Sequence, residues 1–194
     1  MAETRDRLVA SAAELFQRQG FNGTSMKQIT DGANATTGSL YHFFPGGKNE
    51  LAAEVIRTSG AGYLELFQLV TAVATSSAQA ISMLFEGAAA TLENSDFVDG
   101  CPIFTVALEV ASADEALRTA CDSVFATWTA TATAMFRKDG MTPKAADALA
   151  TTVIAALGGA FILARTARDA NRMRAIGRNM TAHVEAATAK GSSG

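Results

Sequence analysis

The stretch Ser25–Lys48 constrains the fold of this 194-residue chain more than any other part of it. Ser25 and Gln28 form an S-x-x-Q capping box, which predicts the start of a short helix. Asn34 predicts its end, because asparagine tolerates the left-handed backbone of a tight turn better than most residues do. Thr36 then caps a second, very short helix. Two short helices joined in this way form a helix-turn-helix, whose second helix is built to enter a DNA major groove.

The residues of the second helix carry a family pattern. The sequence TTGSLYHFFPGGKNEL resembles the TetR (tetracycline-repressor-like) family of bacterial transcriptional regulators, at positions Thr36, Gly38, Leu40, Tyr41, Phe44, Lys48, Glu50 and Leu51. The segment from Thr4 to Gly20 is similar to the first helix of that family. The resemblance implies an all-α fold. It comprises an N-terminal three-helix helix-turn-helix DNA-binding domain, residues 1–50, and a C-terminal helical effector-binding and dimerisation domain, residues 51–190.

Further motifs resemble the LmrA/YxaF-like subgroup of the family. They are the extra residue in Pro45-Gly46-Gly47, GCPI at Gly100 to Ile103, and GAFILAR at Gly159 to Arg165. Two positions depart from the pattern. Asn34-Ala35 replaces the usual Gly-Val of the turn, and Gly158 stands where the subgroup commonly has a glutamate.

Composition favours a soluble helical protein. Hydrophobic residues make up 48% of the chain and only three prolines occur, so mostly helix is expected. No apolar run approaches the roughly 20 residues of a membrane span and no signal peptide is recognisable, which predicts a cytoplasmic protein without a membrane partner. The two cysteines, Cys101 and Cys121, are interpreted as buried structural residues; a disulfide or a redox switch is the alternative.

The net charge of −3 is unusual for a DNA-binding protein. Basic and acidic residues balance within residues 1–57. A DNA-binding function therefore requires the acids to lie away from the phosphates, and it predicts a shallow salt dependence.

The predicted DNA-binding residues are Ser25, Lys27, Thr36, Thr37, Gly38, Ser39, Tyr41, His42 and Lys48. The small residues let the helix backbone approach the groove, and their hydroxyls suit base edges or phosphates. Lys48 lies at a helix start, where its ammonium and the free N–H groups of Gly46, Gly47 and Lys48 would meet a phosphate. A solvated lysine is the alternative.

Periodicity and capping signals predict seven further helices around this motif. A first helix should begin after a Thr4 cap and end near Gln19, and a capping box at Ser112–Glu115 should start a helix that ends near Arg137. The other expected helices are Asn49 to about Thr75, Ala78 to Leu92, Pro102 to Leu108, Pro143 to Arg165 and Ala170 to Ala189.

Two features of the C-terminal part predict binding surfaces. Large aromatic residues on different helices form either ordinary core or the lining of a cavity for an uncharged or weakly polar aromatic effector: Phe67, Phe85, Phe104, Phe125, Trp128 and Phe161. The last two helices are those that pair across the two-fold axis in the resembled family. The residues predicted for a homodimer interface are Gly158, Gly159, Ile162, Met173, Ile176, Met180 and Val184.

The favoured function is a dimeric DNA-binding regulator, a repressor released by a small apolar effector and bound to a palindromic double-stranded operator. An apolar-ligand carrier or sensor without DNA binding is the second hypothesis, because the DNA-binding segment is electrically neutral. An enzyme ranks third, since no catalytic motif, phosphate-binding glycine loop or metal-ligand spacing is found, and no cofactor or metal is expected.

Overall fold

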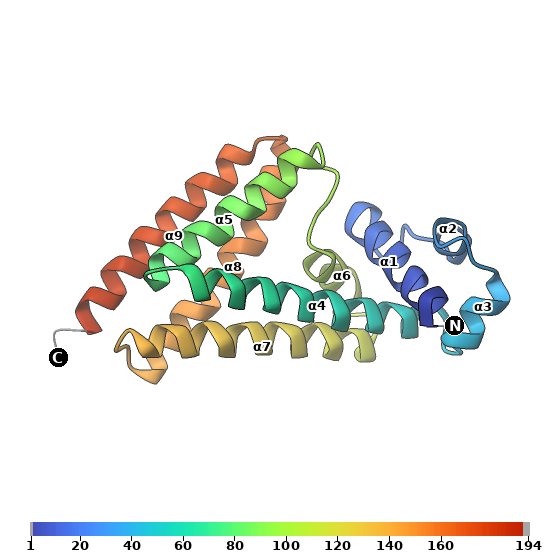
Figure 1. Ribbon diagram of the computed structural model, residues 1–194, viewed down its shortest axis with the longest axis horizontal. Coiled ribbons are helices and arrows are strands. Elements are labelled where there is room, and N and C mark those ends of the chain that lie inside the picture. The colour runs from blue at the N-terminus through green and yellow to red at the C-terminus, as the bar shows by residue number, and fades with distance from the viewer. Residues whose placement is uncertain (1, 192–194) are drawn as a thin grey trace. The chain divides into compact units, whose positions relative to one another are not determined.

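The chain is an all-α protein, as the sequence predicts. The computed structural model describes residues 2–191, and within that range it contains nine α-helices and no strand (Figure 1). They are α1 (Ala2–Gln19), α2 (Met26–Gly32), α3 (Thr37–Phe43), α4 (Gly47–Val73), α5 (Ser77–Asn94), α6 (Pro102–Val110), α7 (Glu115–Lys138), α8 (Pro143–Ala167) and α9 (Ala170–Gly191).

The helices form two compact units. Unit 1 comprises Met1–Gly62 and Asp99–Val124, and unit 2 comprises Tyr63–Val98 and Phe125–Gly194. The chain crosses between them inside α4, in the loop before α6, and inside α7. The domain boundary predicted after residue 50 falls within the continuous helix α4.

Unit 1 is built around α1, which packs against α2, α3 and α6. The predicted apolar face of α1 supplies Leu8, Ala12 and Phe16, each fully buried. Ile29 of α2 and Leu40 of α3 are also fully buried, so both helices of the helix-turn-helix are anchored by apolar contacts.

Two predicted helix starts are wrong. Thr4 lies inside α1, which already begins at Ala2, and its hydroxyl accepts a hydrogen bond from Arg7. Asp114, and not Ser112, caps α7, because α6 extends to Val110 and residues 111–113 form the turn that follows it. The Oδ1 atom of Asp114 accepts from the backbone N–H of Leu117 at 2.8 Å. The predicted cap of α8 by Thr142 with Pro143 is confirmed.

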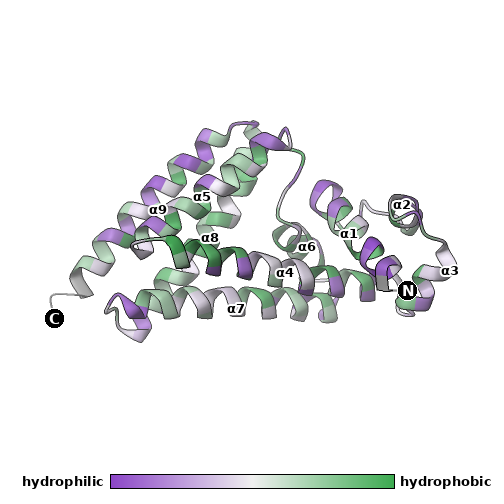
Figure 2. Cartoon of the chain, in the orientation of Figure 1, coloured by the Kyte–Doolittle hydropathy of each residue, from purple (hydrophilic) through white to green (hydrophobic). Residues whose placement is uncertain are grey.

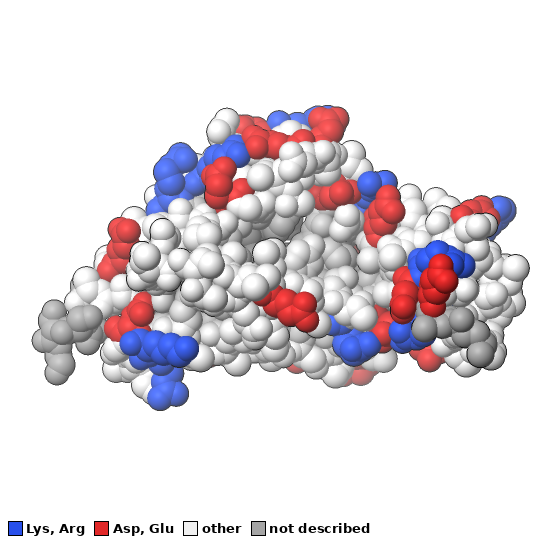
Figure 3. Space-filling view, viewed as in Figure 1, with Lys and Arg blue, Asp and Glu red and all other residues white. Residues whose placement is uncertain are grey.

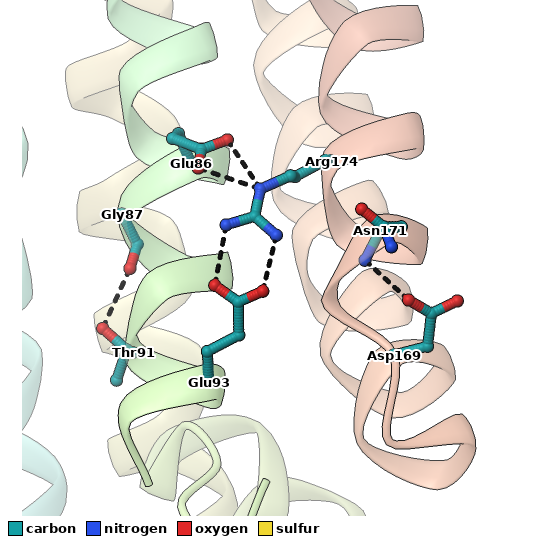
Figure 4. A network of polar contacts seen from close by, with 7 residues as sticks. All are labelled: Glu86, Gly87, Thr91, Glu93, Asp169, Asn171 and Arg174. Atoms are coloured by element: carbon teal, nitrogen blue, oxygen red, sulfur yellow. Dashed lines mark hydrogen bonds and ion pairs between the residues drawn. The ribbon is translucent and has the colours of Figure 1, made fainter. Parts of the chain in front are cut away.

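Unit 2 has its core between α5, α8 and α9, which lie side by side (Figure 1). A Cβ atom at Gly177 of α9 would lie 2.5 Å from the Cβ of Phe85, so these two helices approach closely. Arg174 of α9 links the same pair through charge (Figure 4): its guanidinium donates two parallel hydrogen bonds to Glu93, at 2.7 and 2.8 Å, and its Nε donates to Glu86. Hydrophilic residues recur along α9, as expected for a helix with one buried face (Figure 2).

The expectation that no segment is long and apolar enough to cross a membrane is wrong for α8. By length and composition this helix meets that criterion, with a mean hydropathy of 1.8 over its most apolar window. Core helices of soluble proteins meet the same criterion. Because Leu149, Val153 and Ala160 of α8 belong to the core of unit 2, the apolar composition has a packing role within this chain.

Candidate nucleic-acid interface

The helix-turn-helix is held by local capping bonds. The hydroxyl of Ser25 accepts from the N–H of Gln28 at 3.2 Å, and the Oε1 atom of Gln28 accepts from the N–H of Ser25 at 2.8 Å, which confirms the predicted capping box. Asn34 has a φ of 46° and makes the left-handed turn. Thr36 caps α3, and its Oγ1 atom accepts from the N–H of Ser39 at 3.0 Å. The geometry of α2, turn and α3 is therefore fixed by the sequence itself.

Helix α3 buries one face and exposes the other. Leu40 and the adjoining Phe44 are buried against the rest of unit 1, whereas Thr37, Gly38 and His42 are exposed. A Cβ atom at Gly38 would meet only the Oγ1 atom of Thr36, at an ordinary 3.7 Å. Neither space nor backbone conformation within the chain requires glycine there. The position is one where an external partner can approach the helix backbone closely.

The polar side chains of α3 differ in their freedom. Tyr41 is 50% exposed, and one edge of its ring lies 3.5 Å from where a Cβ of Gly47 would be. His42 contacts Phe43 edge to face, with ring centroids 5.0 Å apart. The hydroxyl of Ser39 is 2.9 Å from that of Thr36, so it is already engaged in the cap.

Lys48, near the start of α4, does not point into open solvent. Its Nζ atom lies 4.3 Å from the ring centroid of Phe21, a cation–π contact. Burial lowers the pKa of Lys48 from its ordinary value, and the charge of Glu109 opposes that shift. The prediction that the N–H groups at this helix start are free is wrong for two of them. The N–H of Gly46 donates to Glu50 at 2.7 Å, and the N–H of Gly47 donates to the carbonyl of Phe44 at 2.8 Å. A phosphate at this helix end would have to displace Glu50.

The other cations of unit 1 are paired with carboxylates. The ion pairs join Arg5 and Arg57 to Glu54, Arg7 to Glu3, Arg18 to Glu14 and Asp99, Lys27 to Asp31, and Arg118 to Glu115. Blue and red side chains accordingly lie next to one another in Figure 3, with no broad basic patch on the face shown. The pairs whose two partners are exposed add little stability, but all of them reduce the positive charge available to phosphates.

Glu109 of α6 is a residue of this region that sequence reasoning missed. Its carboxylate accepts from the N–H groups of Phe21 and Asn22, at 3.2 and 2.6 Å, and so fixes the segment that follows α1. Gly20 has a φ of 81°, and a Cβ there would lie within 2 Å of the Glu109 carboxylate. Glu109 is 88 and 87 positions away from Phe21 and Asn22, so no local sequence pattern could predict the contact.

The predicted effector residues divide between the two units. Phe104 belongs to unit 1, whereas the other five lie in unit 2. Phe125 and Trp128 contact each other edge to face at 5.8 Å, and Tyr63 joins them at 5.9 Å from Trp128. Phe85 is buried in the core of unit 2, and Phe67 and Phe161 pack against that core.

The predicted dimer residues also divide into two groups. Buried members of the chain's own core are Met173, Met180 and Val184, together with the small residue Gly158. Ile162 is 53% exposed, and a Cβ at Gly159 would meet nothing within 4 Å; Ile176 is half-buried. Leu163, which was not predicted, is 49% exposed on the same helix as Ile162.

The cysteines have the properties of structural residues. Both are free and buried, and burial raises the pKa of each thiol to about 11. At neutral pH they are therefore protonated and unreactive. No group of three or more His, Cys, Asp or Glu side chains suited to a metal ion occurs among residues 2–191.

Sequence comparisons divide the chain in a consistent way. Residues 8–55 match the model of "Bacterial regulatory proteins, tetR family", and residues 77–179 match that of "Transcriptional regulator LmrA/YxaF-like, C-terminal domain". The HTH-type regulator YxaF of Bacillus subtilis is 32% identical over 86% of this chain and 87% of its own length. LmrA of the same organism is 28% identical over 86% of this chain and 89% of its own length.

A solved structure provides a comparison of the fold. A cysteine mutant of the TetR-family regulator CifR, complexed with 26-base-pair operator DNA, superposes with a TM-score of 0.77 at 22% identity. The match covers 91% of this chain and 95% of that one. At this identity the likeness concerns the fold.

Proposed function

The chain belongs to the TetR family of bacterial transcriptional regulators, in its LmrA/YxaF-like group, and from this premise we propose a dimeric repressor released from a palindromic operator by a small, largely apolar effector. Such a regulator acts on the chromosome, so its place is the cytoplasm. The family assignment establishes that the chain is a helix-turn-helix transcriptional regulator. The repressor mode, the dimer and the effector are the proposed parts.

One observation carries the DNA-binding proposal: α3 combines a buried anchoring face with an exposed, small and polar face. Leu40 holds the helix to α1, while Thr37, Gly38, Tyr41 and His42 remain available to a partner. With Gly38 at the point of closest approach, the groove edges would meet hydroxyl, phenol and imidazole groups. These groups donate to phosphates and to base acceptors.

The dimer proposal is supported by the surface of α8. Ile162 and Leu163 are large apolar residues exposed within one protomer, and Gly159 leaves room for a neighbouring helix. Burying them against a second copy by four-helix packing would remove apolar surface from water. Two recognition helices related by a two-fold axis would then read half-sites one helical turn apart, or a multiple of it.

Effector release would be a shift between two dimer states, with a coupling free energy of about 1–3 kcal/mol. Helix α4 contributes to both units, and we propose it as the carrier. The effector would favour a spacing of the two α3 helices that no longer fits both grooves.

Fluorescence anisotropy tests this function directly. The protein is titrated into labelled DNA from its own upstream region and into scrambled DNA, over a series of salt concentrations. Specific binding is expected, and it should be weakened strongly by Tyr41→Ala. Since cations of unit 1 are paired, few counterions should be released, and the slope of log K against log[salt] should stay at about −4 or shallower for the dimer.

The same pairing of cations favours one alternative, an apolar-ligand carrier or sensor that does not bind DNA. Absence of any binding at low salt, with the protein folded and dimeric, would select that alternative. Weak binding to both DNAs with a steep salt dependence would exclude specific recognition while leaving the fold unaffected.

A further inference from the structure

A groove in unit 2 lies where the end of α4, the start of α5 and the last turns of α7 meet. Its volume is about 480 Å³, within the range of small-molecule sites. Of the aromatic residues predicted to line an effector site, only Phe67 lines this groove. The lining residues used below are Phe67, Ser76, Ser77, Ala134, Met135, Lys138 and Asp139.

Ser77 supplies a hydrogen-bond donor with no partner. The residue is 5% exposed, and its hydroxyl makes no hydrogen bond within the part of the chain that the structure describes, although its oxygen is not fully enclosed. Because the hydroxyl lines the groove and is not engaged by another group of the chain, it is available to donate to a ligand there. The hydroxyl therefore points to a ligand atom with lone pairs.

The start of α5 adds two further donors beside this hydroxyl. The N-cap Ser76 uses its side chain for the N–H of Gln79, at 3.1 Å. The N–H groups of Ser77 and Ala78 have no acceptor within the helix, as at any helix start. They also lie at the positive end of an 18-residue helix, which favours an anion.

Charge and apolar surface complete the description of the groove. Lys138 and Asp139 both line the groove and carry opposite charges, so their contributions nearly cancel. The positive end of α5 therefore determines the sign of the electrostatic potential in the groove. Phe67 and Met135 also pack against the core of unit 2, and they offer an apolar wall. A ligand with an acceptor group at one end and an apolar body matches both parts.

We propose that this groove binds a small apolar carboxylic acid, whose carboxylate accepts from Ser77 and the N-terminus of α5 while its body lies along Phe67 and Met135. The class differs from the uncharged aromatic effector that the sequence predicts, because the unpartnered donors gather at one end. The inference rests on the proposed function only for its link to DNA release; ligand binding itself is independent of it.

Isothermal titration calorimetry of the full chain tests the site with octanoate and 4-phenylbutyrate, and with their primary amides as neutral controls. Both acids should bind with dissociation constants of about 10–300 μM, and the amides about tenfold more weakly. Ser77→Ala should weaken the acids by about tenfold or more, since a charged hydrogen bond is lost. Ser82→Ala is the matched control, because Ser82 is exposed on the same helix and lies outside the groove lining.

Ala134→Trp places an indole in the groove and should abolish binding, while its circular dichroism and melting curve report whether the chain still folds. No binding of either acid to the wild type, or unchanged binding in a folded Ala134→Trp variant, would overturn the proposal. Equal affinity of acids and amides would overturn the carboxylate assignment. DNA binding is measured separately without ligand. Loss there with ligand binding intact would count against the proposed regulator, and not against the groove.

Discussion

Replacing Gly38 by alanine should stabilise the protein and weaken its DNA binding at the same time. In the free chain the new Cβ would contact only the Oγ1 atom of Thr36, at 3.7 Å, and the backbone is not in the left-handed region. Alanine favours helix over glycine by about 0.5–1 kcal/mol, partly by restricting the unfolded chain. In a chain of this length about 1 kcal/mol corresponds to a rise in Tm of about 2–4 °C.

On DNA the same methyl group should have the opposite effect. If α3 lies in the major groove with Gly38 at the closest approach, the added methyl overpacks a filled interface. Overpacking costs about 1–3 kcal/mol, which corresponds to an affinity about 5–150-fold lower. Thermal melting and fluorescence anisotropy on the same preparation measure the two effects.

Gly62→Ala is the matched control. Gly62 lies inside α4, where a Cβ would meet nothing within 4 Å, so this variant should gain a similar stability without any loss of DNA affinity. Unchanged DNA affinity in Gly38→Ala would refute the placement of α3 in the groove. A drop in Tm would instead refute the argument that the chain has no need of glycine there.

Three further predictions concern stability and reactivity. Gly60→Ala should destabilise unit 1 by about 1–3 kcal/mol in urea unfolding, because its Cβ would lie 2.6 Å from a methyl of Val124. The hydrogen bond from Arg57 lowers the pKa of Glu54 below its ordinary 4.5, so its contribution is present above about pH 4.5 and lost as the pH falls through the lowered value. The stability difference between the wild type and Glu54→Gln should therefore shrink from pH 7 to pH 3 in urea unfolding. The two cysteines, with pKa values of about 11, should resist alkylation by iodoacetamide at pH 7.5 and react within minutes in 6 M guanidinium; rapid labelling of the native protein would contradict their burial.

Much of the helix-turn-helix could be predicted because its determinants are local. The Ser25–Gln28 box, the left-handed Asn34 and the Thr36 cap each involve residues within four positions of one another. The capping box predicted at Ser112 failed for a related reason. A cap depends on where the preceding helix ends, and α6 continued to Val110.

The contacts of the site that join distant segments could not be predicted. Lys48 seemed free at a helix start, but Phe21 and Glu109 determine where its ammonium lies. The aromatic residues predicted to line one cavity are equally compatible with a position in the core. Phe85 is a core residue, because Gly177 of α9 has no side chain and lets α9 pack closely against Phe85 of α5. Hydrophobicity predicts which residues are buried, but only the three-dimensional packing determines whether they line a cavity or fill the core.

The loop before α6 shows what such distant contacts can hold. Asp96 and Phe97 both have left-handed backbones, with φ of 51° and 61°, and such conformations cost about 1–3 kcal/mol each in residues other than glycine. Two arginines at the end of α8 contact this loop: Arg168, the C-cap residue, forms an exposed ion pair with Asp96 at 2.6 Å, and Arg165 donates to the carbonyl of Phe97. Past the crossing into unit 1, Asp99 pairs with Arg18 of α1 at 2.8 Å.

The other two crossings between the units lie inside the continuous helices α4 and α7, which have no comparable strain. The loop is different, because two of its residues have left-handed backbones. Loss of the contacts of Arg165 and Arg168 would favour relaxation of Asp96 and Phe97 toward ordinary backbone angles. The change would then reach Asp99, and through its ion pair α1, the helix on which α2 and α3 are packed. Coupling between an effector site and a DNA-binding helix requires an element with two arrangements, and this strained loop is a second candidate for it beside α4, the proposed carrier.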